Sequence, residues 1–216
     1  MQTLINNLDL FTTGFANTGI LFGFSAVFAL ILGTIVAAMR VSPVPAMRAA
    51  GTVYVNTVRN MPLTVILAFF ALGYAKLNLV PINFLTAAIV GLSLYTATYV
   101  AEAIRSGINT VPVGQAEAAR AIGLPFLPSL TLVILPQAFR SVIPPLFSVF
   151  IALLKNTTVA AGFSVAEAGA IRANLSERGE PALVGLMWVA LVFVILVIGV
   201  LSTLQRYFET KWRVAR

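Results

Sequence analysis

The sequence has no cysteine and no histidine, and it has few charged side chains. Without cysteine the chain forms no disulfide and carries no thiol chemistry. Without histidine, and with only seven acidic residues, a transition-metal site or a histidine-based catalytic triad is not expected. Only 10% of the 216 residues are charged. These absences argue against an enzyme and against a metal site built by this chain.

Apolar residues are abundant instead and make up 59% of the chain. This composition is typical of an integral membrane protein, and the length suits one compact membrane domain. The net charge of +7 would suggest nucleic-acid binding in a soluble protein. In a membrane protein it reflects the Lys and Arg that collect in cytoplasmic loops, so no nucleic-acid partner is expected.

Long uncharged runs predict an all-α membrane protein with about five transmembrane helices, because a helix needs about 20 apolar residues to cross the hydrocarbon core. The second run is short, and the fourth is interrupted at Lys155. We expect the spans over residues 10–39, 60–75, 77–101, 141–166 and 181–205.

The distribution of basic residues predicts the orientation of these spans. Ten Lys and Arg residues, Arg59 among them, fall on one side and three on the other, with Lys155 left in the membrane. Because cytoplasmic loops carry the excess of positive charge, the N-terminus is expected outside and the C-terminus inside. The loop over residues 105–140 is then cytoplasmic.

That loop contains a short polar, alanine-rich segment. Pro112 and the Gly123–Pro125 stretch bracket about ten good helix formers, which predicts a short capped helix. One interpretation is an amphipathic helix lying on the bilayer surface, although its charges are few for that role. The residues that carry the pattern are Gly114, Glu117, Ala118, Ala119, Gly123, Leu135 and Pro136.

The pattern resembles the Glu-Ala-Ala loop of ABC-importer permeases. In that loop Glu-Ala-Ala is followed after three residues by Gly, and after nine more by Ile-x-Leu-Pro; here Val133 replaces the Ile. The resemblance implies a type I ABC-importer permease fold in which this segment is a cytoplasmic coupling helix that docks on an ATPase subunit.

Other blocks resemble the polar amino acid subfamily of these permeases. They are the segments around Arg59, Asn60 and Pro62, around Glu102 and Arg105, and over residues 154–158. The sequence of residues 100–119 is similar to that of glutamate permeases of actinobacterial type. The resemblance implies a transmembrane domain over residues 15–207, an extracytoplasmic segment over 1–14 and a cytoplasmic tail over 208–216.

The resemblance also implies partners. These are an ABC ATPase dimer, a second permease subunit that is identical or similar, an extracytoplasmic substrate-binding protein, membrane lipid and a polar amino acid, most specifically glutamate. The chain has no Gly-x-x-x-x-Gly-Lys-Ser/Thr phosphate loop, so ATP and Mg²⁺ are expected on the ATPase and no cofactor on this chain. The alternative is a secondary transporter or channel driven by an ion gradient, which would often show paired broken spans and an acid at mid-span.

Two groups of residues are candidates for gating or structure. Glu102 and Arg105 are three apart on a helix and close enough to pair, either as a solvated pair or in transmitting motion. Arg59 is interpreted as an anchor near the cytoplasmic end of the second span. Asn60 and Pro62 are expected to shape the start of that span.

Lys155 is the candidate for contact with substrate. It lies about 15 Å along the fourth span from Pro145, near mid-bilayer, where an unpaired ammonium is costly. Asn156, Thr157 and Thr158 add hydrogen-bonding groups where the helix is expected to loosen before Gly162. The alternatives are that Lys155 reaches outward to the interface or pairs with Glu167.

Overall fold

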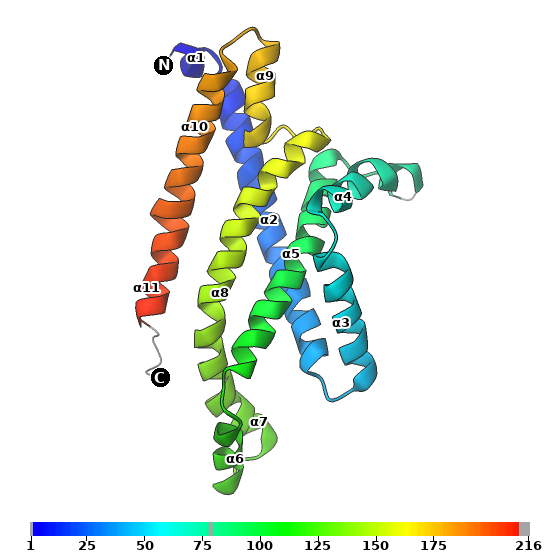
Figure 1. The fold of residues 1–216 in the computed structure, drawn as a ribbon, viewed down its shortest axis with the longest axis vertical. Coiled ribbons are helices and arrows are strands. Elements are labelled where there is room, and N and C mark those ends of the chain that lie inside the picture. The colour runs from blue at the N-terminus through cyan, green and yellow to red at the C-terminus, as the bar shows by residue number, and fades with distance from the viewer. Residues whose placement is uncertain (1, 78–79, 212–216) are drawn as a thin grey trace.

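The computed structural model describes residues 2–77 and 80–211, and within these ranges every regular element is a helix (Figure 1). The longest is α2 (Leu8–Val41), which follows the short α1 (Gln2–Asn6). α5 (Phe84–Asn109) and α8 (Leu135–Asn156) pack beside it. α10 (Ala182–Val194) continues through a π-helical stretch, Ile195–Ser202, into α11 (Thr203–Lys211).

Four helical stretches in the described ranges are long and apolar enough to cross a membrane: Leu8–Val41, Phe84–Asn109, Phe126–Phe163 and Ala182–Lys211. A fifth crossing exists if the bent pair Pro45–Arg59 and Leu63–Gly73 forms one span. The number agrees with the expectation of about five spans, which follows from hydropathy and length alone.

The second span differs from the straight helix predicted over residues 60–75. α3 (Pro45–Arg59) and α4 (Leu63–Ala68) meet at a bend of 96°. Pro62 adopts an extended backbone, with ψ of 133°, and has no N–H to continue the ladder of α3. The helix therefore begins before Arg59, as the short uncharged run suggested, with its first residue 15 positions before that run, and it breaks where the run starts.

The third and fourth spans also need correction. The third begins at Phe84, inside the predicted run and after Pro81 as expected, and it extends to Asn109, beyond the predicted end at residue 101. The fourth is helical from Phe126 to Phe163 and passes through Lys155 without a break. Its geometry changes at Thr157, where a 3-10 segment (Thr157–Phe163) begins, so the loosening expected before Gly162 is confirmed.

α2 and α5 approach each other closely along a ladder of small residues. Ser25, Ala29, Gly33 and Ala37 recur at every fourth position on the buried side of α2. A Cβ added at Gly33 would lie 2.6 Å from Cβ and Cγ1 of Val100. Close packing through small residues is a common way to hold membrane helices together, since lipid supplies little hydrophobic drive between them.

α5 and α8 meet just as closely near the loop that joins them. A Cβ on Gly107 would lie 2.2 Å from Cγ2 of Val142 and 3.1 Å from its backbone nitrogen. Gly107 is two residues before the end of α5, and Val142 lies in the first half of α8. The two helices are therefore in backbone-level contact at this end.

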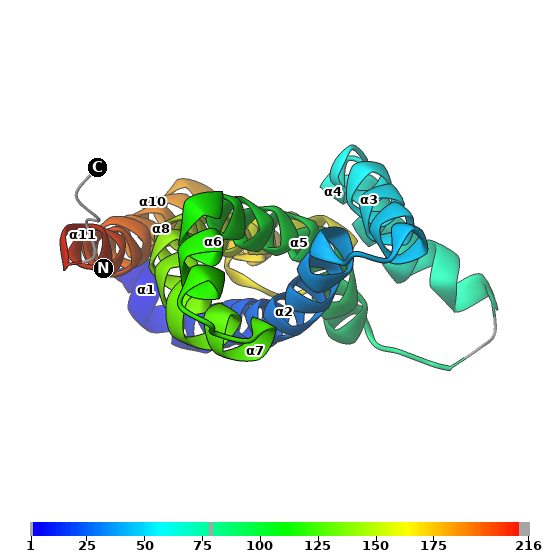
Figure 2. The same ribbon diagram turned by 90° about the horizontal axis from the view of Figure 1, so that it is seen from below.

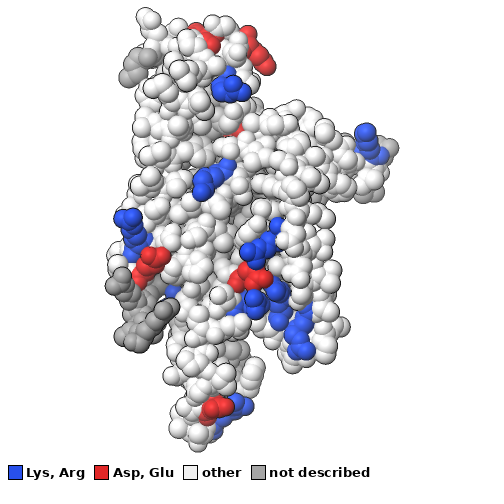
Figure 3. Space-filling model, in the orientation of Figure 1, with Lys and Arg blue, Asp and Glu red and all other residues white. Residues whose placement is uncertain are grey.

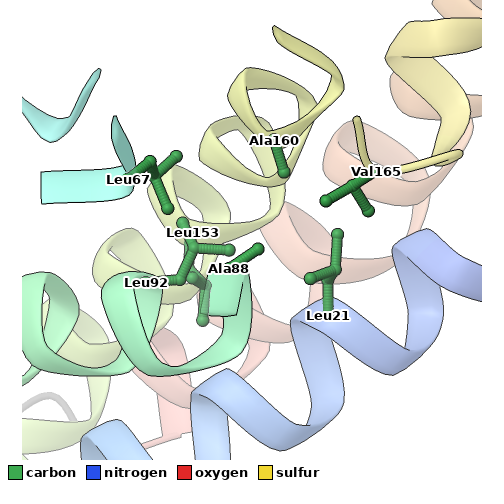
Figure 4. Close-up of a cluster of buried hydrophobic side chains, with 7 residues drawn as sticks. All are labelled: Leu21, Leu67, Ala88, Leu92, Leu153, Ala160 and Val165. Atoms are coloured by element: carbon green, nitrogen blue, oxygen red, sulfur yellow. The ribbon is translucent and has the colours of Figure 1, made fainter. Parts of the chain in front are cut away.

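The main apolar core lies where α2, α4, α5, α8 and the 3-10 segment converge (Figure 4). By contrast, only 11% of the most apolar window of the Ala182–Lys211 helix is buried, which suits a helix surrounded by lipid. The buried cluster consists of Leu21, Leu67, Ala88, Leu92, Leu153, Ala160 and Val165.

The two ends of the bundle carry different elements. α1, α9 (Ile171–Glu177) and the start of α10 lie at one end, and α6 (Val113–Ala121) and α7 (Phe126–Pro128) lie at the other (Figure 1). Seen from below, α6 and α7 cover the ends of α5 and α8 (Figure 2). Arg178 closes the first end by donating to Asp9 at 3.0 Å and to Asn7 at 2.9 Å.

Candidate functional site

The predicted coupling segment forms α6, a helix at the tip of the molecule. Pro112 precedes it as the N-cap. Its C-terminal end is closed by two backbone hydrogen bonds, from Gly123 N–H to Arg120 C=O at 2.9 Å and from Leu124 N–H to Ala119 C=O at 3.0 Å. This pair of bonds defines a Schellman motif, in which the residue after the cap is left-handed.

Gly123 is that left-handed residue, with φ of +85°. Side chains are strained in this conformation, whereas glycine adopts it freely. A Cβ at Gly123 would meet nothing within 4 Å, and the same holds at Gly114. Within this chain the glycine of the motif is thus required by the backbone conformation.

The surface of α6 is suited to a partner. Glu117 and Ala118 are exposed, while Ala119 is buried against the rest of the loop. Leu135 and Pro136 start α8, directly after the π-helical stretch Ser129–Ile134. Large apolar side chains stand out at this tip, with 65–80% of their surface exposed: Val113, Ile122, Phe126 and Leu127.

Glu102 lies between two arginines near the same end of α5. It accepts from Arg105 at 3.0 Å, which confirms the expected pair, and from Arg40 of α2 at 2.5 Å. The Arg40 side chain is only 11% exposed. Sequence reasoning missed Arg40, because it lies 62 positions away and only the packing of α2 on α5 brings it close. The cluster ties these two helices together (Figure 3 shows basic side chains gathered between α3 and α5).

Arg59 does not lie at the cytoplasmic end of a span as interpreted from the sequence. It ends α3, a 15-residue helix that rises about 21 Å from its first residue. Its guanidinium carbon lies 5.2 Å from the centroid of the Tyr99 ring, in the middle part of α5. Asn60 donates to the backbone of Asn56 at 2.7 Å and stays exposed, and Pro62 forms the bend.

A cavity of about 400 Å³ lies between α5 and α8; its surface is mostly apolar, with hydroxyl and amide groups among the lining side chains. The hydroxyl groups of Tyr95 and Tyr99 lie 2.8 Å apart, one turn from each other on α5. Sequence reasoning missed these tyrosines, although their i, i+4 spacing in an apolar span was visible. The lining residues are Tyr95, Thr96, Tyr99, Ser148, Val149, Ala152, Leu153 and Asn156.

The four residues predicted for the substrate path lie differently around this cavity. Asn156 lines it. Lys155 is exposed and is not among the residues that line the cavity. Thr157 is fully buried and donates to Leu154 C=O at 2.8 Å, and Thr158 donates to Lys155 C=O at 2.7 Å. The hydroxyl groups of the two threonines thus form hydrogen bonds to the backbone of their own helix.

Glu167 is not the partner of Lys155. Its carboxylate is 1% exposed, and it accepts from the Gly169 N–H at 2.9 Å and from the Thr18 hydroxyl at 3.3 Å. Burial raises the pKa of this carboxyl above its ordinary value, and the two hydrogen bonds oppose the rise. The alternative of a Lys155–Glu167 link is therefore wrong.

Residues 29–214 match the protein family described as binding-protein-dependent transport system inner membrane component. The chain belongs to this family. A permease of this kind works with a binding protein and an ATPase and is not itself an ATPase, as the missing phosphate loop indicates. It is a multi-pass inner membrane protein, and the alternative of a carrier or channel driven by an ion gradient is not retained.

Curated relatives cover most of this permease. It is 46% identical over 166 residues to the glutamate transport system permease protein GluC of Corynebacterium efficiens, covering 72% of this chain and 73% of the relative. It is 45% identical over 186 residues to GluC of Corynebacterium glutamicum, covering 80% and 81%. A probable glutamine ABC transporter permease of Bacillus subtilis, GlnM, is 36% identical over 159 residues, covering 74% and 73%.

Solved structures confirm the fold. A crystal structure of an amino acid ABC transporter with histidines matches with a TM-score of 0.90 and 25% identity over 97% of both chains. An inward-facing structure of the MetNI methionine ABC transporter matches with a TM-score of 0.74 at 19% identity, covering 94% of this chain and 98% of the other. The permease thus has the ABC-importer fold.

Proposed function

We propose that this permease carries glutamate across the cytoplasmic membrane through the cavity between α5 and α8. The observation that carries the proposal is this cavity of about 400 Å³, whose hydroxyl and amide groups suit a zwitterionic substrate. Glutamate is the substrate in the printed names of two relatives that share 45–46% identity with the chain. Lys155 precedes the lining residue Asn156 in the sequence, and its ammonium would meet a carboxylate, which every amino acid carries.

Transport is driven through α6. Gly114, Glu117 and Ala118 form the face that seats in a groove of the ATPase, Ala119 packs beneath this face, Gly123 caps the helix, and the apolar tip side chains complete the contact. ATP and Mg²⁺ bind to the ATPase dimer rather than to this chain. A second permease subunit, identical or similar, forms the other half of the pathway, and lipid covers the apolar outer helices.

The end that carries α6 faces the cytoplasm, with the C-terminus on that side and the N-terminus outside. The excess of Lys and Arg toward this end supports this orientation. The substrate-binding protein then docks at the end formed by α1 and α9. A reporter enzyme fused to the C-terminus should be active only if it functions in the cytoplasm, and activity of an exported reporter there would reverse the orientation.

The test of the substrate is uptake by the complete importer, reconstituted in liposomes with its ATPase and binding protein. Labelled glutamate should enter only with ATP, and unlabelled glutamine or arginine should compete poorly. Uptake of another amino acid in preference to glutamate would refute the proposal.

The role of Lys155 is tested in the same assay by Lys155→Met, which keeps the length and removes the charge. Losing one charge-assisted hydrogen bond costs about 1.5–3 kcal/mol, so KM for transport should rise by roughly one to two orders of magnitude. Basal ATPase activity should remain, because Lys155 is at the opposite end of α8 from α6. Lys76→Met is the matched control, and unchanged kinetics in Lys155→Met would remove Lys155 from the path.

A further inference from the structure

The last described helix, α11, touches the wall of the cavity from outside. It packs beside α8 (Figure 1), where Phe208 stacks on Phe147 with ring centroids 5.5 Å apart. Next to this stack, Nε2 of Gln205 donates to the hydroxyl oxygen of Ser148 at 3.2 Å. Ser148 lines the cavity, whereas none of the described residues of α11 does. Gln205 can therefore act on a molecule in the cavity only through Ser148.

The orientation of the Gln205 side-chain amide is fixed by a second partner. Its Nε2 also donates to Oε1 of Glu209 at 3.0 Å, one turn further along α11. A carboxylate only accepts hydrogen bonds, so the NH2 group of the amide, and not its oxygen, must lie on this side. The NH2 group has a second hydrogen, and this is the one that is donated to Ser148.

This arrangement decides how the Ser148 hydroxyl can be used. A hydroxyl has one hydrogen to donate and two lone pairs that accept. Gln205 occupies one of these lone pairs. In the described part of the chain Ser148 donates to no protein acceptor, in contrast to Ser141 of the same helix, which donates to the backbone of Gln137 at 3.3 Å. The proton of the Ser148 hydroxyl is therefore left for an acceptor in the cavity.

We propose that Gln205 is a positioning residue that makes Ser148 a hydrogen-bond donor to a carboxylate of the amino acid in the cavity. The proposal rests on the proposed function, because it requires that the substrate passes through this cavity. A hydroxyl that donates to an ionised carboxylate forms a stronger hydrogen bond than a neutral pair does. Every amino acid carries the α-carboxylate, so the contact contributes affinity and does not choose among amino acids.

The test is a series of substitutions at Gln205 that change the hydrogen-bonding role offered to Ser148. Lysine only donates, methionine does neither, and glutamate only accepts. The permease–ATPase complex is placed in nanodiscs without the binding protein, and labelled glutamate is displaced by unlabelled glutamate. Gln205→Lys should stay within about twofold of wild type, and Gln205→Met should bind roughly two- to tenfold more weakly. Gln205→Glu should bind most weakly, because its carboxylate takes the Ser148 proton.

Ser148→Ala supplies the second arm of the test. Removing the hydroxyl should weaken glutamate binding roughly ten- to one-hundred-fold, as expected for a lost hydrogen bond to a charged group. In the Ser148→Ala background the three substitutions at Gln205 should make no further difference, because they act through the missing hydroxyl. A general effect of charge or packing at position 205 would persist in this background, and the proposal would then be wrong.

Thr210→Val is the matched control on α11. Thr210 is exposed and donates to the backbone of its own helix, to the carbonyl groups of Arg206 and Tyr207 at 3.0 Å each. This substitution should leave glutamate binding unchanged. If it weakens binding as much as Gln205→Met does, the effect comes from a disturbed α11 and the role of Gln205 is overturned.

The remaining outcomes separate this proposal from the proposed function. A wild-type complex that prefers glutamine to glutamate refutes the assignment of glutamate, and the same series measured with glutamine still tests Gln205, because glutamine has the same α-carboxylate. A wild-type complex that binds no amino acid refutes both proposals. Equal affinities of the Lys, Met and Glu variants, or loss of the assembled complex in all three on size-exclusion chromatography, would overturn the role of Gln205 alone.

Discussion

The close approach of α2 and α5 at Gly33 gives a sharp test of the packing. Gly33→Ala places a methyl group 2.6 Å from two carbons of Val100 and 2.9 Å from the carbonyl oxygen of Ala97. Non-bonded carbons prefer about 3.5–4.0 Å, so the contact is short by about 1 Å. The carbonyl and the Val100 Cβ belong to the framework of α5 and cannot rotate away. The two helices must therefore separate.

The cost follows from overpacking, which typically destabilises by about 1–3 kcal/mol. Gly23→Ala is the matched control, because it lies on the same helix and its new Cβ would meet nothing within 4 Å. Any gain in helix propensity, up to about 1 kcal/mol, is common to both variants. The difference between them isolates the steric cost, and we expect Gly33→Ala to be less stable by about 1–3 kcal/mol.

The assay is reversible unfolding of the purified permease by SDS in mixed micelles, followed by tryptophan fluorescence. The free energies of unfolding of the two alanine variants are compared with that of wild type. A Gly33→Ala variant within about 0.5 kcal/mol of Gly23→Ala, which is the range of inconsequential surface changes, would refute the contact between α2 and α5.

Three further predictions concern the cap of α6, the Glu102 cluster and the buried Glu167. Gly123→Val should abolish coupled transport and release the ATPase in pull-downs, since a β-branched residue is strained at φ of +85°. Gly123→Asn should have a milder effect, because asparagine tolerates the left-handed conformation. Equal effects of the two substitutions would show that the left-handed backbone of Gly123 is not what the helix cap requires. Glu102→Gln should lower the free energy of unfolding by about 1–3 kcal/mol, because it leaves the largely buried Arg40 without its carboxylate. The control Glu180→Gln should have little effect. Equal values for the two variants would show that the contact of Arg40 with Glu102 does not stabilise the fold. The raised pKa of Glu167 means that its contribution to stability is complete below the ordinary value of 4.5 and is lost as pH rises through the higher folded pKa. The free energy of unfolding should therefore fall as pH rises above 4.5 in wild type and stay flatter in Glu167→Gln.

Hydropathy predicted the number of spans well, because long apolar runs have few alternatives in a membrane. The existence of the short helix α6 was equally predictable, since Pro112 and Gly123 mark its ends by local backbone chemistry. The ladder of small residues from Ser25 to Ala37 was also predictable, because these residues form a four-residue repeat in the sequence.

Arg59 shows where sequence reasoning fails. Counting Arg59 among the cytoplasmic cations assumed that a charge marks the end of a span, but α3 runs for 15 residues before it. The cavity could not be predicted either. Its walls come from α5 and α8, whose facing sides are set by tertiary packing, as is the contact of Arg40 with Glu102.

The contact between Gly107 and Val142 has a mechanical consequence. It joins α5 and α8 next to α6, and the same two helices form the walls of the cavity farther along. A force on α6 that preserves this contact can open or close the cavity only by pivoting the helices about it. Tyr99 is about 12 Å from this fulcrum and Asn156 about 21 Å. The lever therefore enlarges a small rotation most at Asn156, the end of the cavity farthest from α6.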